Sequence, residues 1–157
     1  MPTQKLKQYL DEQNVRYVSI NHSLAFTSLQ IAKSADIPTK QMAKTVILKI
    51  NNQLAMLIIP SAFQVNLELI GLALVGSKME LTTESEFSSK FPDCEVGAMP
   101  PFGNLYDMEV FVAETLAEDK EIAFNAGTHT ELIRMSYEDF ERWVEPIVLK
   151  FTHKCFA

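Results

Sequence analysis

The sequence is poor in cysteine, and its two cysteines, Cys94 and Cys155, form no Cys-x-x-Cys pair. Neither a disulfide framework nor a zinc site is therefore indicated, and a reducing, cytoplasmic setting is expected. Five glycines and seven prolines are too few for a collagen-like or low-complexity chain of 157 residues. The longest apolar run, Leu54 to Pro60, is far shorter than the ~18–20 residues that a membrane span requires. The opening residues also lack the apolar centre of a secretory signal.

Basic residues are scarce as well, with 14 Lys and Arg against 20 Asp and Glu and a net charge of −6. This balance argues against a broad nucleic-acid-binding surface. The charge is unevenly spread, however, because residues 1–50 carry a net +4 and residues 51–157 a net −10. The first third of the chain can therefore offer a small anionic ligand a favourable local field.

The length is that of one ordinary globular domain, and we expect residues 1–157 to form it. Hydrophobic periodicity and capping patterns predict helices after Thr3, after the capping box Thr27–Gln30, over Val65–Leu74, around Phe87 and after Ser136. Strands are predicted over Val15–Ile20, Ala43–Ile50, Gln53–Ile59, Val110–Glu114, Glu121–Asn125 and Glu131–Met135, with a two-residue turn at Asn51-Asn52. This order favours an α+β fold with a mixed, curved sheet.

One lysine interrupts an otherwise apolar strand pattern. Lys44 stands second in the segment Ala43-Lys44-Thr45-Val46-Ile47-Leu48. Because lysine is seldom buried without a partner, its side chain either extends to the rim of the sheet to reach solvent or is held in place to bind an anion. The residues alone leave both alternatives open.

A second segment, Gly97-Ala98-Met99-Pro100-Pro101-Phe102-Gly103-Asn104, combines two adjacent prolines with a glycine on either side. The prolines fix φ and donate no hydrogen bond, while the glycines permit unusual backbone angles. Such a loop is stiff, and it can direct the N–H groups of Gly97, Ala98 and Met99 at a carbonyl oxygen. The plainer alternative is a turn-rich connection, which most clusters of Pro and Gly form.

The third segment, Asn125-Ala126-Gly127-Thr128-His129-Thr130, leads into a predicted strand. Gly127 permits a sharp turn, and the three residues that follow it can line a polar pocket. A lone histidine in a turn, however, is more often a surface residue than a catalytic group. His22 also has two alternatives, the edge of a pocket or a hydrogen bond at the end of a strand. None of these segments decides the function by itself.

Taken together, the segments resemble the YbaK/prolyl-tRNA-synthetase-associated family of aminoacyl-tRNA editing domains. Asn21-His22 precedes a helical region as in that family, and Ala43-Lys44-Thr45-Val46 matches its lysine-bearing strand. Gly97-Ala98-Met99-Pro100-Pro101 fits the family's Gly-x-x-x-Pro loop, and the stretch from Phe124 to His129 and on to Arg134-Met135 fits its late strand–turn–strand. The resemblance runs nearly from end to end.

The resemblance implies a mixed, barrel-like sheet surrounded by helices, and a trans-acting deacylase that hydrolyses the ester of a mischarged tRNA. It also implies that Lys44 holds the phosphate or ribose of the 3′-terminal adenosine, that the loop from Gly97 to Pro101 cradles the aminoacyl carbonyl, and that His129 borders the side-chain pocket. The implied catalytic residues are Lys44, Gly97, Ala98, Met99 and Pro101, and the implied substrate-binding residues are His22, Thr45, Pro100, Gly127, Thr128 and His129. No metal or other cofactor is expected.

A positioned water and preorganised backbone donors can hydrolyse an ester without a protein nucleophile, so the lack of an evident Ser/His/Asp or Cys/His set is no obstacle. The amino acid is expected to be small (alanine, cysteine or serine, on tRNA(Pro) by analogy), because one methylene discriminates by only ~1–3 kcal/mol and synthetases confuse small residues. An aminoacyl-tRNA synthetase is a further expected partner, and a membrane is not.

Two alternatives stay open at this point. The acidic balance modestly favours a non-catalytic module that binds aminoacyl-tRNA, a nucleotide or a synthetase through the same cleft, because a tRNA-binding protein commonly carries more Lys and Arg. An unrelated α+β domain that binds a small molecule is the other alternative, and it requires that the three segments do not converge in space.

Overall fold

The computed structural model describes residues 4–21, 41–60, 79–82, 99–118, 120–127 and 130–149. The helices within these ranges are α1 (Gln4–Glu12), the 3-10 helix η2 (Gly103–Leu105), α5 (Glu114–Ala117) and α6 (Tyr137–Val144). The strands are β1 (Tyr17–Asn21), β2 (Ala43–Ile50), β3 (Gln53–Pro60), β4 (Met79–Leu81), β5 (Glu109–Ala113), β6 (Glu121–Asn125), β7 (Glu131–Ser136) and β8 (Ile147–Leu149). The predicted α+β class is confirmed. The helices predicted after Thr27, over Val65–Leu74 and around Phe87 lie outside the described residues.

A tight hairpin organises the larger sheet. β2 and β3 pair antiparallel along their whole length, and the turn between them consists of Asn51 (φ 53°) and Asn52 (φ 68°). Two positive φ angles define the type I′ geometry, which matches the twist of the flanking strands and which asparagine tolerates well. The hairpin predicted from the sequence is therefore confirmed, including its two-residue turn.

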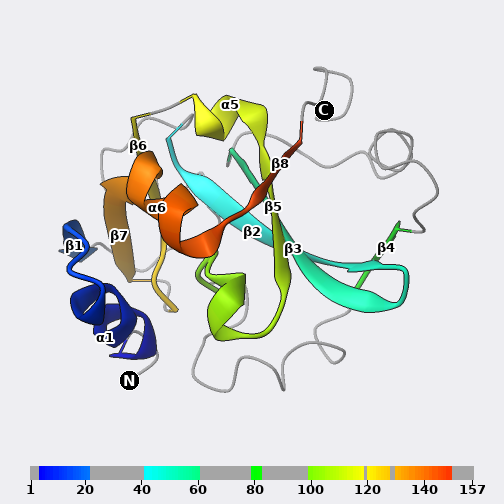
Figure 1. Ribbon diagram of the computed structural model, residues 1–157, viewed down its shortest axis with the longest axis horizontal. Helices are drawn as coiled ribbons and strands as arrows, with labels where there is room; N and C mark the ends of the chain where they lie inside the picture. Colours follow the sequence, from blue (N-terminus) through cyan, green and yellow to red (C-terminus); the bar gives the residue numbers. More distant parts are fainter. Residues whose placement is uncertain are drawn as a thin grey trace.

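The hairpin lies inside a five-stranded mixed sheet with the order β4-β2-β3-β5-β8. β2 pairs antiparallel with β4, whereas β3 pairs parallel with β5 and β5 pairs parallel with β8. Figure 1 shows β4 near the hairpin turn on one side of the molecule, and β1, β6 and β7 on the other side. The mixed character of the sheet agrees with the prediction.

The other three strands form a second sheet with the order β1-β7-β6, antiparallel throughout. The two sheets meet at the residues that precede β2. Met42 forms a parallel bridge with Ala123 of β6, and the Ala123 N–H donates to the Gln41 carbonyl over 2.9 Å. The sheets are not closed into a barrel within the described part of the chain, so the barrel-like detail of the prediction is not confirmed.

One face of the joined sheets carries the main hydrophobic cluster. It contains alternate residues of β2 and β6 together with side chains from both longer helices; among its members are Ala43, Ile47, Phe124, Ala126, Leu6, Leu10, Tyr137 and Phe140. Met42, which directly precedes β2, and Leu48 of β2 occupy the intervening positions; both are buried, yet neither belongs to this cluster. Because successive side chains of a strand point to opposite faces, Met42 and Leu48 lie on the second face.

The described helices are held at their ends by local hydrogen bonds. α1 ends at Glu12 and is followed by Asn14 in a left-handed conformation (φ 56°), and the N–H of Val15 donates to the Leu10 carbonyl over 3.0 Å, as in a left-handed C-cap. α6 begins at Tyr137 and is capped, as predicted, by Ser136, whose Oγ accepts from the Asp139 N–H over 3.1 Å. No helix in the described residues is long and apolar enough to cross a membrane.

Candidate functional site

Lys44 lies on the second face of the sheet, near the start of β2. Its β3 partner is Ile59, which is fully buried and, like Met42, stands outside the main cluster. The lysine stem therefore runs between apolar neighbours, and the side chain is partly buried. The strand that the sequence predicted thus places the lysine on an apolar surface close to the junction of the two sheets.

The charge of Lys44 is not neutralised within the described part of the chain. No acidic side chain there forms an ion pair with its ammonium group. Burial lowers the pKa of Lys44, because the charged form loses hydration without gaining a counter-charge. An anion placed beside this ammonium would restore the lost stabilisation, so these observations favour the anion-binding alternative over the solvent-reaching one.

Thr45 does not share the face of Lys44. The two residues are adjacent in β2, so their side chains point to opposite sides of the sheet. A ligand that lies against the Lys44 ammonium can therefore meet the backbone of Thr45 but not its hydroxyl on that face. The substrate-binding role that the resemblance implies for Thr45 stays a prediction.

The proline-containing loop is fixed at its carboxyl end. Met99, Pro100 and Pro101 are all buried, and the ring of Phe102 packs against Phe124 and Phe140 with centroid distances of 5.6 and 5.7 Å. The loop continues directly into η2, where the Gly103 carbonyl accepts from two backbone N–H groups at 2.9 Å. The expected stiffness is consistent with this anchoring.

The loop and Lys44 are not joined by any described contact. The Met99 side chain belongs to the main cluster, together with Ala43, and not to the face of Lys44. Gly97 and Ala98, which with Met99 carry the predicted backbone donors, lie outside the described residues. A shared crevice between the loop and the lysine therefore stays a prediction, and Met99 can contribute to it only through its backbone.

The β6–β7 turn places Gly127 at the far end of β6. Gly127 is buried and adopts φ 99°, a left-handed conformation that favours glycine, and the Ala126 N–H donates to the Glu131 carbonyl over 3.1 Å. The predicted sharp turn is thus confirmed. Thr128, His129 and His22 lie outside the described residues, so their roles, like the substrate contact of Gly127, stay predictions.

Asn125 is a candidate that the sequence reasoning did not single out for a role. Its side chain is only 7% exposed, and its Oδ1 atom has no hydrogen-bond partner among the described residues. The Met42–Ala123 bridge is parallel. Lys44 lies two residues after Met42, and Asn125 lies two residues after Ala123. Because side chains repeat every second residue, both point to the face of Met42 and Ala123. A polar residue at the end of the apolar strand Ile122-Ala123-Phe124 was the available signal.

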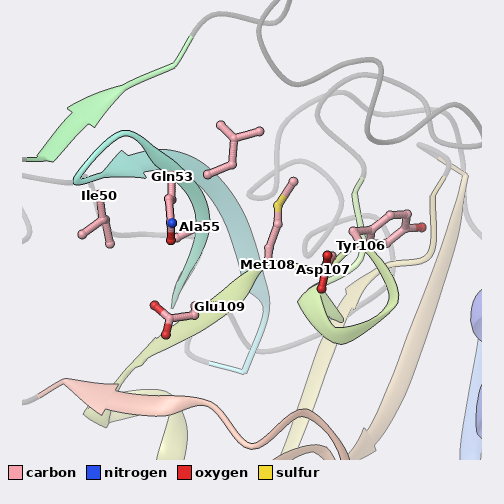
Figure 2. Close-up of a pocket in the computed structure, with 8 residues that line it drawn as sticks. Ile50, Gln53, Ala55, Tyr106, Asp107, Met108 and Glu109 are labelled. Carbon is pink, nitrogen blue, oxygen red and sulfur yellow. The ribbon is translucent and has the colours of Figure 1, made fainter.

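A cavity of about 370 Å³ lies elsewhere, at the hairpin end of the sheet. Its lining includes Gln53, Tyr106, Asp107 and Glu109, and Figure 2 shows the two carboxylates there. Six residues of extended strand, or about 20 Å, separate Lys44 from the Ile50 wall of this cavity. Carboxylates repel a phosphate, so this cavity is unsuited to the end of a tRNA and is not the site that the sequence predicts.

Comparison with protein families identifies the family of the matched region. A model described as the aminoacyl-tRNA editing domain matches residues 22–143, which is more than half of the chain. The matched range contains Lys44, the proline-containing loop, the β6–β7 turn and Asn125. No curated protein matches the sequence.

Solved structures share the fold at low identity. A proposed trans-editing enzyme for prolyl-tRNA synthetase superposes with a TM-score of 0.79 at 17% identity, over 96% of this chain and 98% of that one. A hypothetical protein superposes with a TM-score of 0.82 at 17% identity, over 94% and 98% of the two chains. A proposed signal transduction protein from Marinobacter aquaeolei gives 0.70 at 17% identity, over 93% of this chain but 30% of its own. At such identities, the likeness establishes the fold alone.

Proposed function

Because the chain belongs to the aminoacyl-tRNA editing domain family, we propose that it is a trans-acting deacylase that hydrolyses the ester of a mischarged tRNA. The amino acid removed is small (alanine, cysteine or serine), and tRNA(Pro) is the favoured carrier. The solved relative described as a proposed trans-editing enzyme for prolyl-tRNA synthetase supports this choice of tRNA. A prolyl-tRNA synthetase is accordingly the partner we propose, and the cytoplasm is the proposed setting.

The observation that carries the proposal is the state of Lys44. A partly buried ammonium without an acidic partner among the described residues is costly unless a ligand supplies the counter-charge. The 3′ end of a tRNA offers that charge as the phosphate of its terminal adenosine. A compact ammonium suits a phosphate as a point charge. Lys44 therefore binds and orients the end of the substrate.

The chemical step needs a water molecule and a stabilised oxyanion. Water attacks the carbonyl carbon of the ester, and the negative charge develops on the carbonyl oxygen of the tetrahedral intermediate. Backbone N–H groups of Gly97, Ala98 and Met99 stabilise that charge, and the loss of one such donor typically lowers the rate by ~10²–10³. The bond between the carbonyl carbon and the ribose oxygen then breaks, and that oxygen takes a proton. Free amino acid and uncharged tRNA are released.

Size selects the amino acid. A pocket bordered by Pro100, Gly127, Thr128 and His129, with His22 and Thr45 nearby, admits a small side chain and excludes a larger one by contact. Steric exclusion of the larger side chain protects the correctly charged tRNA from hydrolysis. Favourable contacts alone would discriminate between side chains that differ by one methylene by only ~1–3 kcal/mol. The deacylase thus acts as a second sieve after the synthetase.

The direct test is to incubate the purified protein with tRNA(Pro) charged with alanine, cysteine, serine or proline and to follow the release of labelled amino acid. We expect at least one of the three small amino acids to be released about tenfold faster than in buffer, and proline to be retained. Binding of all four species without release of any amino acid would contradict the proposal and favour the non-catalytic binding module.

A further inference from the structure

The side chain of Asn125 contains a buried hydrogen-bond acceptor, and no donor among the described residues bonds to it. Its side chain is more than nine-tenths buried, and Oδ1 has no partner within the described part of the chain. A buried polar atom without a partner destabilises the fold, and native proteins keep few of them. A donor that arrives with a ligand would complete this hydrogen bond.

The same face of the sheet carries the charge of Lys44, which no acidic side chain among the described residues neutralises. Lys44 and Asn125 each lie two residues beyond the isolated parallel bridge between Met42 and Ala123, on segments that leave the bridge in the same direction. β2 and β6 are in direct contact. Two unmet requirements therefore lie on one face close to the junction of the sheets, an anion for the ammonium and a donor for the amide oxygen.

The terminal nucleotide of a tRNA meets both requirements with one sugar. Its 5′ oxygen carries a phosphate, and its ribose carries hydroxyl groups that donate hydrogen bonds. The α-ammonium group of the amino acid is also a donor, but its positive charge would be repelled by Lys44 in this poorly hydrated setting. A neutral hydroxyl is not repelled, so the ribose is the better match for Asn125.

We infer that Asn125 is a substrate-binding residue whose Oδ1 accepts a hydrogen bond from a free hydroxyl of the terminal ribose, beside the phosphate held by Lys44. This inference rests on the proposed function, because it assumes that the tRNA end occupies this face. Asn125 thereby recognises the sugar and holds it in a fixed orientation relative to the phosphate.

Equilibrium binding of short oligonucleotides tests the inference without requiring hydrolysis. The probes are the 5′-fluorescein trinucleotide cytidine-cytidine-adenosine and its analogue that ends in 2′,3′-dideoxyadenosine, measured by fluorescence anisotropy. We expect the wild type to bind the ribose probe about 3–10-fold more tightly than the dideoxy probe, as one hydrogen bond predicts.

The informative variant is Asn125→Leu, which keeps the approximate side-chain volume and removes the acceptor. It should bind the ribose probe as weakly as the dideoxy probe, leave the affinity for the dideoxy probe unchanged, and unfold at the same or a higher temperature than the wild type. Asn125→Asp retains an acceptor and should keep the preference for ribose. Asn104→Ala is the matched control on another part of the surface, where Asn104 bonds to Tyr9 and Trp143, and it should keep the preference in full.

Three outcomes would overturn the inference: equal binding of the two probes by the wild type, a preference for ribose that survives in Asn125→Leu, and an equal loss of affinity for both probes in that variant. The proposed function fails separately. A preference for ribose without deacylation of any mischarged tRNA would refute the enzyme but not the binding role of Asn125, and deacylation without the preference would refute only that role.

Discussion

Tyr137 and Asn125 each hold a buried polar atom without a hydrogen-bond partner among the described residues. Their surroundings differ. Tyr137 belongs to the main hydrophobic cluster and packs against Phe140 with a centroid distance of 5.7 Å, whereas Asn125 lies on the face of Lys44. The apolar surroundings of Tyr137 indicate a packing role, whereas the position of Asn125 on the face of Lys44 is the basis of the ligand-binding role proposed above.

The packing role of Tyr137 predicts a stabilising substitution. Tyr137→Phe removes the unpaired hydroxyl and keeps the ring, so the free energy of unfolding at pH 7 should stay equal or rise by about 1 kcal/mol. Burial, with the nearby Glu141 carboxylate, raises the pKa of Tyr137 to about 12 from its ordinary value of 10.0. Between pH 10 and pH 12 the unfolded chain therefore loses this proton while the folded chain keeps it, and the stability of the wild type falls.

The variant lacks this proton, so its advantage over the wild type should grow by about 2 kcal/mol as the pH rises from 10 to 12. Urea unfolding of both proteins at pH 7 and at pH 11 measures the difference. A variant that loses stability at pH 11 as steeply as the wild type would show that Tyr137 does not titrate as described.

At the scale of elements, the longer local patterns that fall within the described residues predicted structure correctly. The β2–β3 hairpin follows from eight-residue apolar strands and two consecutive asparagines, and α6 follows from the Ser136 cap and the spacing of Phe140 and Val144. The three-residue strands β4 and β8 were missed, because so few residues show no period and pair only through tertiary contacts. Glu114 was assigned to a strand, yet it begins the four-residue helix α5.

The candidate site was only partly predictable for a related reason. Alternation marks Lys44 as an interruption of an apolar strand, but it cannot tell which segment lies beside that strand. The Met42–Ala123 bridge joins residues far apart in sequence, so the neighbourhood of Lys44 and Asn125 required the fold. The family resemblance identified the three candidate segments, and the bridge between Met42 and Ala123 in the structure added Asn125 to the candidates.

The turn after the proline-containing loop gives a prediction at this scale. A Cβ atom at Gly103 would lie 2.5 Å from the Met108 carbonyl oxygen and 2.6 Å from Val110 Cγ2, closer than real contacts allow. Gly103→Ala should therefore displace η2 and lower the free energy of unfolding by about 2–3 kcal/mol, whereas the adjacent Asn104→Ala should cost less than about 1 kcal/mol. Thermal and urea unfolding of the two variants compare them, and equal stabilities would mean that η2 tolerates a side chain here.

At the scale of the whole molecule, charge and shape divide the sheet into two ends. The Asp107 and Glu109 carboxylates line the cavity at the hairpin end. Lys44, which no acidic side chain among the described residues neutralises, lies at the junction of the two sheets. Under the proposed function, the anionic end of the tRNA is expected to be drawn to the Lys44 end and repelled from the cavity, so the overall acidic charge is compatible with a nucleic-acid substrate.

The role of Lys44 in binding the substrate is tested most directly by the single-turnover rate of deacylation of Lys44→Ala and Lys49→Ala. The rate is measured on whichever mischarged tRNA the wild type hydrolyses fastest. Both variants remove one positive charge from β2, but only Lys44 lies at the junction of the sheets. We predict that Lys44→Ala lowers the rate at least about tenfold, the loss expected when a charge-assisted bond to phosphate is removed, and that Lys49→Ala stays within about twofold of the wild type. An equal loss of rate in the two variants, or full activity in Lys44→Ala, would contradict the proposed role of Lys44 in binding the substrate.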